Sequence, residues 1–301
     1  MQQQYNPRNA DLKIWVNGQL LSRQDAKVSV FDSVVQGGDA VWEGIRIYDG
    51  YAFMLDQHID RMLDSAHALA FRNVPAREAI AEAVFATLRA NGMRDGAHIR
   101  LTLTRGEKIT SGMDPRLNQQ GCTLIVLAEW KPPVYDNQQG IRLITSSVRR
   151  NNPQFLDSKI HHNNLLNNIL AKIEANVAGA DDALMLDASG FVAETNATNV
   201  FMVRRGALCT PHADACLPGI TRQLVIDMAR ETGIPVQEKN LSLTEFYNAD
   251  EVFTTGTMGE LTPVREIDGR PIVNKGTGAL LGKLREQFRT KIPVYGAKLP
   301  F

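Results

Sequence analysis

The spacing of hydrophobic residues along the N-terminal half predicts two hairpins, two helices and two further strands. Apolar and polar residues alternate around Asn17-Gly18 and again around Asp49-Gly50, and such dipeptides favour two-residue hairpin turns. Apolar residues then recur every three or four positions, which indicates amphipathic helices. The expected elements are hairpins over residues 13–20 and 44–53, helices over 56–69 and 75–91, and strands over 98–104 and 123–129. A polar loop, residues 105–120, separates the last two strands and has the length typical of a functional loop.

Two prolines mark a boundary near the middle of the chain. Pro132 and Pro133 lie in the stretch 131–139, and proline interrupts both helices and interior strands. We therefore expect a small N-terminal domain over residues 1–130, an interdomain linker over 131–139, and a larger domain over 140–301.

The larger domain combines short strands with helices. One apolar helix face is formed by Leu165, Leu166, Ile169, Leu170, Ile173 and Val177. A second helix, residues 223–232, is closed by Gly233. Strands are expected over residues 141–148, 182–187, 191–194, 199–203 and 208–210. Since the pattern has antiparallel hairpins with helices set apart from them, it favours an α+β fold over a doubly wound parallel sheet.

Composition excludes several classes of protein. The chain has 301 residues with 33 Lys+Arg and 33 Asp+Glu, so no basic field indicates binding to nucleic acid or to an anionic membrane. Its hydrophobic content of 44% fits a globular protein, and no apolar run reaches the roughly 20 residues of a transmembrane helix. The residues after Met1 show no signal-peptide pattern. Three cysteines without metal-ligand spacing, Cys122, Cys209 and Cys216, are expected to be free thiols in a reducing cytoplasm.

One lysine, Lys159, stands in the unusual setting Asp157-Ser158-Lys159-Ile160-His161-His162. Lysine condenses with carbonyl groups, so a placed lysine with a distant carboxylate suggests a pyridoxal 5'-phosphate (PLP) site. Glu194, at the end of an expected strand, would keep the pyridine nitrogen of such a cofactor protonated and its ring an electron sink. His161 and His162 are adjacent and point to different faces, so joint metal ligation is not expected and no metal site is predicted.

A phosphate site is expected where Pro218-Gly219-Ile220-Thr221 opens a helix. The free N–H groups and the dipole at a helix start bind anions, and glycine allows a phosphate to approach closely. Arg61, on the predicted helix that also carries His58, would supply a balancing positive charge.

The order of these segments resembles the class IV aminotransferases, together with Val41-Trp42-Glu43-Gly44-Ile45-Arg46 and Gly256-Thr257-Met258-Gly259-Glu260. This family of fold-type IV PLP enzymes includes branched-chain aminotransferases, D-amino acid transaminases, (R)-amine transaminases and aminodeoxychorismate lyases. The resemblance runs from about Ile14 to Pro293. It implies a small α/β N-terminal domain, a larger pseudo-barrel C-terminal domain, and a homodimer whose active sites lie at the subunit boundary.

The resemblance also implies roles for single residues. Lys159 would bind PLP covalently and move a proton between the substrate Cα and the cofactor C4′. Thr257 would join Ile220, Thr221 and Arg61 around the phosphate. Substrate contacts are expected from Gly37, Trp42, His98, Arg100, Arg105, Met258 and Gly259. At least one of the two arginines is expected to bind a carboxylate, and both could face the substrate only if the strand bends near Gly106.

Signals for the substrate are mixed. Ile99-Arg100 and the loop Gly112-Met113-Asp114-Pro115 resemble branched-chain aminotransferases, but Asn164 stands where those enzymes commonly carry a tyrosine. Thr104-Arg105-Gly106 and Val41-Trp42 instead resemble D-amino acid and (R)-amine transaminases. We expect a branched-chain-aminotransferase-like enzyme that uses 2-oxoglutarate or a similar keto acid. The alternatives are a D-amino acid or (R)-amine transaminase and a PLP lyase of the aminodeoxychorismate lyase type.

Overall fold

The computed structural model describes residues 4–273 and 279–301, and its internal contacts divide the chain into two compact units. The N-terminal unit contains residues 4–132, 160–164 and 292–301. The C-terminal unit contains residues 133–159 and 165–291, apart from 274–278. The sequence predicts one boundary, at 131–139, whereas the contacts also assign two short later segments to the N-terminal unit, because both pair with its strands.

The N-terminal unit is built on a seven-stranded antiparallel sheet with the order β16-β4-β3-β5-β6-β1-β2. Its strands are β1 (Lys13–Val16), β2 (Gln19–Ser22), β3 (Ala40–Tyr48), β4 (Tyr51–Phe53), β5 (Ala97–Thr104), β6 (Thr123–Trp130) and β16 (Gly296–Lys298). Both predicted hairpins are confirmed. Asn17 and Gly18 turn with φ of 45° and 88°, and Asp49 and Gly50 with 46° and 83°, as a type I′ turn requires.

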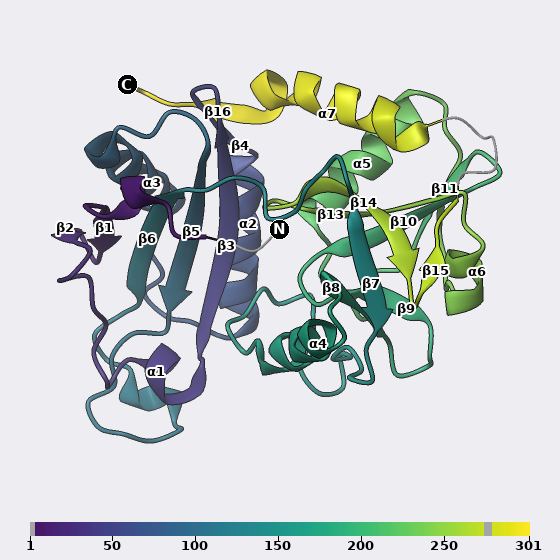
Figure 1. The fold of residues 1–301 in the computed structure, drawn as a ribbon. Coiled ribbons are helices and arrows are strands. Elements are labelled where there is room, and N and C mark those ends of the chain that lie inside the picture. Colours follow the sequence, from purple (N-terminus) through teal and green to yellow (C-terminus); the bar gives the residue numbers. More distant parts are fainter. Residues whose placement is uncertain (1–3, 274–278) are drawn as a thin grey trace. The chain divides into compact units, whose positions relative to one another are not determined.

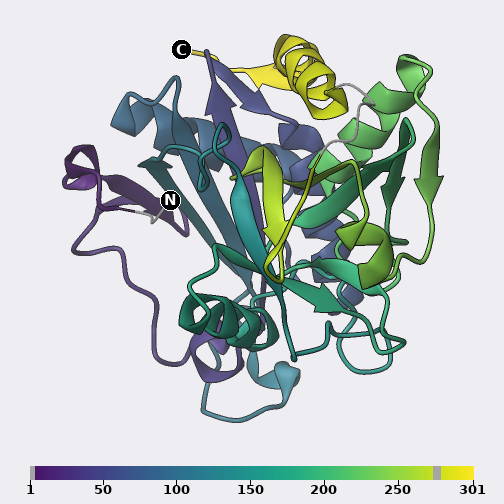
Figure 2. The ribbon, with the colours of Figure 1, turned by 45° about the vertical axis from the view of Figure 1, so that its right-hand side comes forward.

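Two helices cover this sheet, α2 (Leu55–Ala68) and α3 (Arg77–Asn91), and both were expected from the sequence. Their position against the strands can be followed in Figure 1 and Figure 2. Ile59 and Met62 of α2 are fully buried, as are Ile80 and Leu88 of α3, so the apolar faces form the core with the sheet. The connections contain the short helices η1 (Pro7–Asn9), α1 (Ser33–Gly37) and η2 (Pro115–Leu117).

The first half of β3 pairs with the segment of residues 160–164 that follows Lys159. β4 pairs with β3 only at Ile47 and Tyr48, so the backbone N–H and C=O groups on the same side of the earlier part of β3 can bond to another segment. The Trp42 N–H donates to the His161 carbonyl and the Asn163 N–H donates to the Ala40 carbonyl, both at 2.9 Å. The chain therefore enters the N-terminal unit directly after the candidate catalytic lysine.

The C-terminal unit contains a nine-stranded mixed sheet, with the order β12-β11-β10-β13-β14-β7-β8-β9 and β15 paired to β14. The strands are β7 (Ile141–Thr145), β8 (Asp182–Leu186), β9 (Val192–Thr195), β10 (Asn199–Arg204), β11 (Ala207–Thr210), β12 (Val236–Glu238), β13 (Glu251–Gly256), β14 (Glu260–Ile267) and β15 (Arg270–Pro271). The five strands expected here are confirmed as β7 to β11, while the remaining four add to them. Three pairs are parallel: β11 with β12, β14 with β7, and β7 with β8.

Helices of the C-terminal unit are α4 (Leu166–Val177), α5 (Ile220–Glu231), α6 (Leu243–Tyr247) and most of α7 (Leu280–Tyr295), since the division between the units falls within α7. α4 packs through Ala171 and Ala175 against Ala183 and Met185 of β8. Its predicted apolar face is formed but not buried. We call this face the α4 stripe: Leu166, Ile169, Leu170, Ile173 and Val177, which are 50% to 85% exposed.

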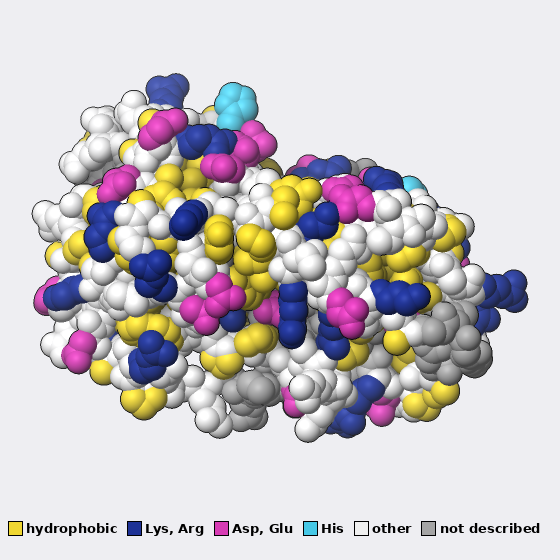
Figure 3. Space-filling view, turned by 90° about the horizontal axis from the view of Figure 1, so that it is seen from above, with side chains coloured by type: hydrophobic (Ala, Val, Ile, Leu, Met, Phe, Trp, Pro, Cys, Tyr) yellow, Lys and Arg dark blue, Asp and Glu magenta, His cyan; other side chains and the backbone are white. Residues whose placement is uncertain are grey.

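The surface carries both signs of charge. In the view of Figure 3, Lys and Arg side chains are interspersed with Asp and Glu, in agreement with the balanced composition. Within the described ranges, no helix has the length and apolar character needed to span a membrane. Cys122, Cys209 and Cys216 are free thiols, as expected.

Candidate functional site

Glu194 lies buried on β9 and is held by three hydrogen-bond donors of the C-terminal unit. Arg150 Nε donates to Glu194 Oε1 at 2.6 Å, and Asn199 Nδ2 donates to Oε2 at 3.2 Å. The Leu217 N–H donates to Oε1 at 3.4 Å. Burial raises the pKa of Glu194, although Arg150 and the Leu217 N–H favour the carboxylate. A carboxyl group in this state can share a proton with a basic nitrogen placed beside it.

The turn before α5 lies close to the side chain of Asn199 on β10. A Cβ on Gly219 would lie 2.0 Å from Oδ1 of Asn199. α5 begins at Ile220, and among the described residues no side chain caps its N-terminus. The N–H groups of Ile220 and Thr221 therefore lie at a helix start of the kind that can bind anions, and phosphate binding there stays a prediction.

The turn after β13 lies beside the same strand end. Asn199 of β10 is the register partner of Thr255 on β13, so Gly256 and Thr257 follow next to the start of β10. A Cβ on Gly256 would lie 3.0 Å from Cγ2 of Thr198, which leaves little room for a side chain. Thr255 Oγ1 is buried and has no hydrogen-bond partner among the described residues. Glu194, the α5 start and the Thr257 turn thus gather at one edge of the C-terminal sheet.

Met258 and Gly259 continue this turn, and their carbonyl groups are engaged. The Met258 carbonyl accepts from the Val134 N–H at 3.1 Å, and the Gly259 carbonyl accepts from Asn137 Nδ2 at the same distance. Thr262 Oγ1 donates to the Gly259 carbonyl at 2.8 Å. These bonds fix the backbone of the turn. Its contact with a substrate carboxylate stays a prediction.

Lys159 lies in a turn that is hydrogen-bonded to Asn151, the residue after Arg150. The Lys159 N–H donates to Asp157 Oδ1 at 3.0 Å, and Ser158 Oγ donates to the Asn151 carbonyl at 2.8 Å. Asn151 directly follows Arg150, which forms the ion pair with Glu194. The lysine residue is exposed, so its Nζ is accessible for covalent chemistry.

In the N-terminal unit, Arg61 of α2 binds Glu43 of β3 with two hydrogen bonds. Arg61 Nε donates to Glu43 Oε1 at 2.8 Å, and Nη2 donates to Oε2 at 2.7 Å. Glu43 is fully buried, and no role for it was expected from the sequence. A signal was available, because a glutamate lies within a largely apolar strand while His58 and Arg61 lie one turn apart on the facing helix.

Trp42 and Arg100, both predicted to contact substrate, are in contact with each other. The Arg100 guanidinium lies over the Trp42 ring, 3.4 Å from its centroid, and its Nη2 donates to Asn163 Oδ1 at 3.2 Å. Burial lowers the pKa of Arg100 to about 10. Trp42 Nε1 donates to the His162 carbonyl at 3.1 Å. The tryptophan and the arginine are therefore both fixed by the segment after Lys159.

His98 lies two residues before Arg100 on β5 and is nearly buried. Burial, followed by the charge of Lys131, lowers the pKa of His98 to about 3, so the ring is neutral at pH 7. Its Nε2 has no hydrogen-bond partner within the described part of the chain, and it occupies space left by Gly44, whose Cβ would lie 3.0 Å away.

Arg105 and Gly37 have surroundings that differ from those of Arg100. Arg105 Nε and Nη2 donate to Asp39 at 2.5 and 3.2 Å, and its nitrogens also donate to the carbonyls of Leu69 and Ala70. Its guanidinium therefore binds groups of its own unit. Gly37 ends α1 and is exposed, and a Cβ there would meet nothing within 4 Å.

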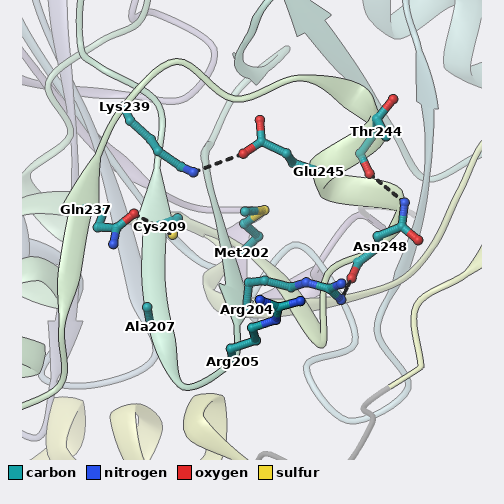
Figure 4. Close-up of a pocket in the computed structure, with 10 residues that line it drawn as sticks. All are labelled: Met202, Arg204, Arg205, Ala207, Cys209, Gln237, Lys239, Thr244, Glu245 and Asn248. Carbon is teal, nitrogen blue, oxygen red and sulfur yellow. Dashed lines mark hydrogen bonds and ion pairs between the residues drawn. The ribbon is translucent and has the colours of Figure 1, made fainter.

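A pocket of about 600 Å³ lies elsewhere in the C-terminal unit. The ten residues that line it, drawn in Figure 4, include none of those predicted for the site. Its polar groups hold local structure: Lys239 pairs with Glu245 at 2.9 Å, Glu245 closes the capping box of α6 with Ser242, and Arg204 donates to the Asn248 carbonyl. This pocket is distinct from the candidate site.

Comparisons with known proteins agree with the fold. A family model described as Amino-transferase class IV matches residues 40–267. The crystal structure of branched-chain aminotransferase from Thermoproteus uzoniensis with norvaline matches with a TM-score of 0.87 and 33% identity, covering 96% of this chain and 99% of that chain. The protein belongs to the class IV aminotransferase family and has the predicted fold-type IV architecture.

Two relatives are closely similar in sequence. Branched-chain-amino-acid aminotransferase-like protein 2 of Arabidopsis thaliana is 60% identical over 294 residues, which cover 98% of this chain and 53% of that protein. A putative branched-chain-amino-acid aminotransferase of Methanocaldococcus jannaschii is 46% identical over 289 residues, which cover 96% and 99%. The chain thus spans about half the length of the Arabidopsis relative and nearly all of the archaeal one.

Proposed function

We propose that this protein is a PLP-dependent aminotransferase that moves an amino group between a branched-chain amino acid and a 2-oxo acid such as 2-oxoglutarate. The observation that carries the proposal is the arrangement at one edge of the C-terminal sheet. There, a buried Glu194 lies beside the uncapped start of α5, in a chain that keeps the lysine of the family motif, Lys159. Branched-chain names among the relatives support the substrate class.

The residues present fit PLP. A phosphate needs N–H donors, and the N–H groups of Ile220 and Thr221 at the start of α5 would supply them, because the N-cap residue Gly219 has no side chain to cap the helix. Ile220, Thr221 and Thr257 would hold the phosphate, with Arg61 as its cationic partner. The buried Oγ1 of Thr255, which lacks a partner among the described residues, adds an unsatisfied polar atom at the same edge.

The mechanism assigns proton handling to two side chains. When bound, PLP supplies an electron-accepting ring that makes the substrate Cα–H acidic. Lys159 would hold the cofactor covalently and, once displaced by an amino substrate, would use Nζ to take the Cα proton and return it at C4′. Glu194 would keep the proton on the pyridine nitrogen, and Arg150 and Asn199 fix the orientation of its carboxyl group.

Arg100 is the better placed of the two predicted carboxylate-binding arginines. Arg105 already binds Asp39 and two carbonyl groups, whereas Arg100 lies against Trp42 and, among the described residues, donates one hydrogen bond, to the amide side chain of Asn163. A guanidinium that is partly desolvated and oriented by an aromatic ring suits bidentate carboxylate binding. Trp42 and His98 would shape the neighbouring side-chain pocket, with Gly37, Met258 and Gly259 as further contacts.

The protein is further proposed to act as a cytoplasmic homodimer that associates through the α4 stripe. Five apolar side chains exposed along one helix form a contiguous surface that water solvates poorly. A stripe on one helix can pair with its own copy across a two-fold axis, and the family resemblance implies a homodimer. Free thiols fit a reducing compartment.

Two alternatives keep the cofactor but change the substrate or the reaction. Trp42 and the Thr104-Arg105-Gly106 motif favour a D-amino acid or (R)-amine transaminase, although the partners of Arg105 weaken that argument. A PLP lyase would need no amino acceptor.

A half-reaction screen separates these possibilities. The PLP-loaded protein is mixed in turn with L-Leu, L-Glu, D-Ala and (R)-1-phenylethylamine, and the absorbance of the bound cofactor is followed. We expect L-Leu and L-Glu to convert the cofactor to its amine form, and 2-oxoglutarate to restore it. Conversion by D-Ala or the amine alone would favour the first alternative, and no conversion by any donor would contradict the transaminase.

A further inference from the structure

The N-terminal unit contains a buried ionic network centred on Glu43. Besides its two bonds with Arg61, the carboxylate lies 2.6 Å from His58 Nδ1 and 3.0 Å from His161 Nδ1. Glu43 is 0% exposed, and a buried carboxylate is tolerated only when it is paired and hydrogen-bonded. One carboxylate thus joins β3, helix α2 and the segment that follows Lys159.

The protonation states of this network follow from burial. Burial raises the pKa of Glu43, but His161 and Arg61 hold it well below its usual range. Burial lowers the pKa of His58, and lowers that of His161 to about 4. At neutral pH the network is therefore one carboxylate, one guanidinium and two neutral imidazoles, each of which donates an Nδ1–H to Glu43.

His161 is fixed from several sides. Its N–H donates at 3.1 Å to Oγ of Ser65, which lies one turn beyond Arg61 on α2, and its ring lies 4.2 Å from that of Trp42. Its carbonyl accepts from the Trp42 N–H. The imidazole that contacts Glu43 is therefore held by the same helix that carries Arg61.

We propose that Glu43 is the positioning residue for Arg61, and that it sets the guanidinium plane for binding the cofactor phosphate. The inference rests on the proposed function. An arginine side chain is flexible, and a carboxylate that binds its Nε and Nη2 edge restricts the guanidinium to one plane before any ligand arrives. His58 and His161 hold the Glu43 carboxylate in place, so the orientation of Arg61 depends on Glu43 and on both histidines.

The test compares PLP with pyridoxal, which has the same aldehyde but no phosphate. Under the proposed function both compounds would react with Lys159, so the ratio of their affinities isolates the contribution of the phosphate contacts. Glu43→Gln is expected to lower this ratio by about 10- to 100-fold, the scale of one charged hydrogen-bonded contact. Arg61→Ala should lower it to a similar degree, and the double variant should be no worse than Arg61→Ala alone.

Two further variants complete the experiment. Asp60→Asn is the matched control, because Asp60 precedes Arg61 on α2 but forms an exposed pair with Arg77, and its affinity ratio should equal that of the wild type. Arg61→Lys keeps the charge and leaves Glu43 intact but cannot form the two-pronged contact, so its ratio should fall even if Glu43→Gln fails to fold.

Two outcomes are distinguishable. If the wild type binds neither compound at Lys159, the proposed function fails. If the wild type prefers PLP but Glu43→Gln and Arg61→Lys keep the wild-type ratio, or if the effects of Glu43→Gln and Arg61→Ala add fully, only the role assigned to Glu43 is overturned. If Glu43→Gln weakens both compounds equally, as a general folding defect would, the ratio of Arg61→Lys decides, and a wild-type ratio in that variant overturns the role of Glu43.

Discussion

Arg100 and Arg105 lie five residues apart, yet their environments differ in a way that their sequence context does not reveal. Arg105 follows the end of β5 and meets Asp39, whereas Arg100 lies within the strand and stacks on Trp42. Both residues match arginines of family motifs, and only packing decides which guanidinium is already paired. Residue type and spacing therefore predict that an arginine binds a carboxylate, and contacts between residues distant in sequence decide which arginine does so.

These environments predict opposite results for two alanine variants. Arg100→Ala should reduce turnover with 2-oxoglutarate by about 10- to 100-fold, since a charged contact to the carboxylate is lost, and should leave the melting temperature close to that of the wild type. Arg105→Ala should lower the melting temperature, because Asp39 loses its partner, and should change the kinetics less. Steady-state kinetics and thermal unfolding measure both. The reverse pattern would show that Arg105 is the carboxylate ligand.

Other site residues differ in how far sequence could predict them. Lys159 and Glu194 lie in motifs whose residue types match the chemistry, so they could be proposed without a structure. Arg150 could not, because its contact with Glu194 joins residues 44 positions apart. Glu43 was quoted only as part of a motif, and its contact with His161 spans 118 positions.

At the scale of elements, the residue pattern predicted the hairpins and helices, which depend on interactions between residues close in sequence. Hairpins with Asn-Gly and Asp-Gly turns and helices with clear periodicity were found close to their expected positions. No strand was expected at β13 or β14, although motif residues lie there, because the hydrophobic pattern of a strand buried within a mixed sheet is not distinctive. The pairing of residues 160–164 with β3 also depends on long-range contact.

The α4 stripe shows that periodicity predicts an apolar face but not what covers it. If a second copy covers the stripe, Ile173→Lys should convert the homodimer to a monomer, because a buried charge would replace an apolar contact. Ser189→Lys, at an exposed polar position of the same unit outside α4, is the control and should remain dimeric. Light scattering measures both. A dimer that survives Ile173→Lys unchanged would place the interface elsewhere.

At the scale of the whole molecule, the chain crosses between its two units directly after Lys159. The lysine turn is anchored through Asn151 and Arg150 in the C-terminal unit, while Ile160 to Asn164 pair with β3 in the N-terminal unit. Residues predicted to bind the cofactor therefore sit on one compact unit, apart from Arg61, and most of those predicted to bind substrate sit on the other.

The covalent attachment of the cofactor is the central claim, and peptide mapping tests it most directly. The protein is treated with PLP and then with borohydride, which fixes the cofactor to the amine that holds it, and the labelled peptide is identified by mass spectrometry. We predict a pyridoxyl label on Lys159, and no specific label or turnover in Lys159→Ala. A label on Lys172 or on any other lysine, or a Lys159→Ala enzyme that still turns over, would contradict the account.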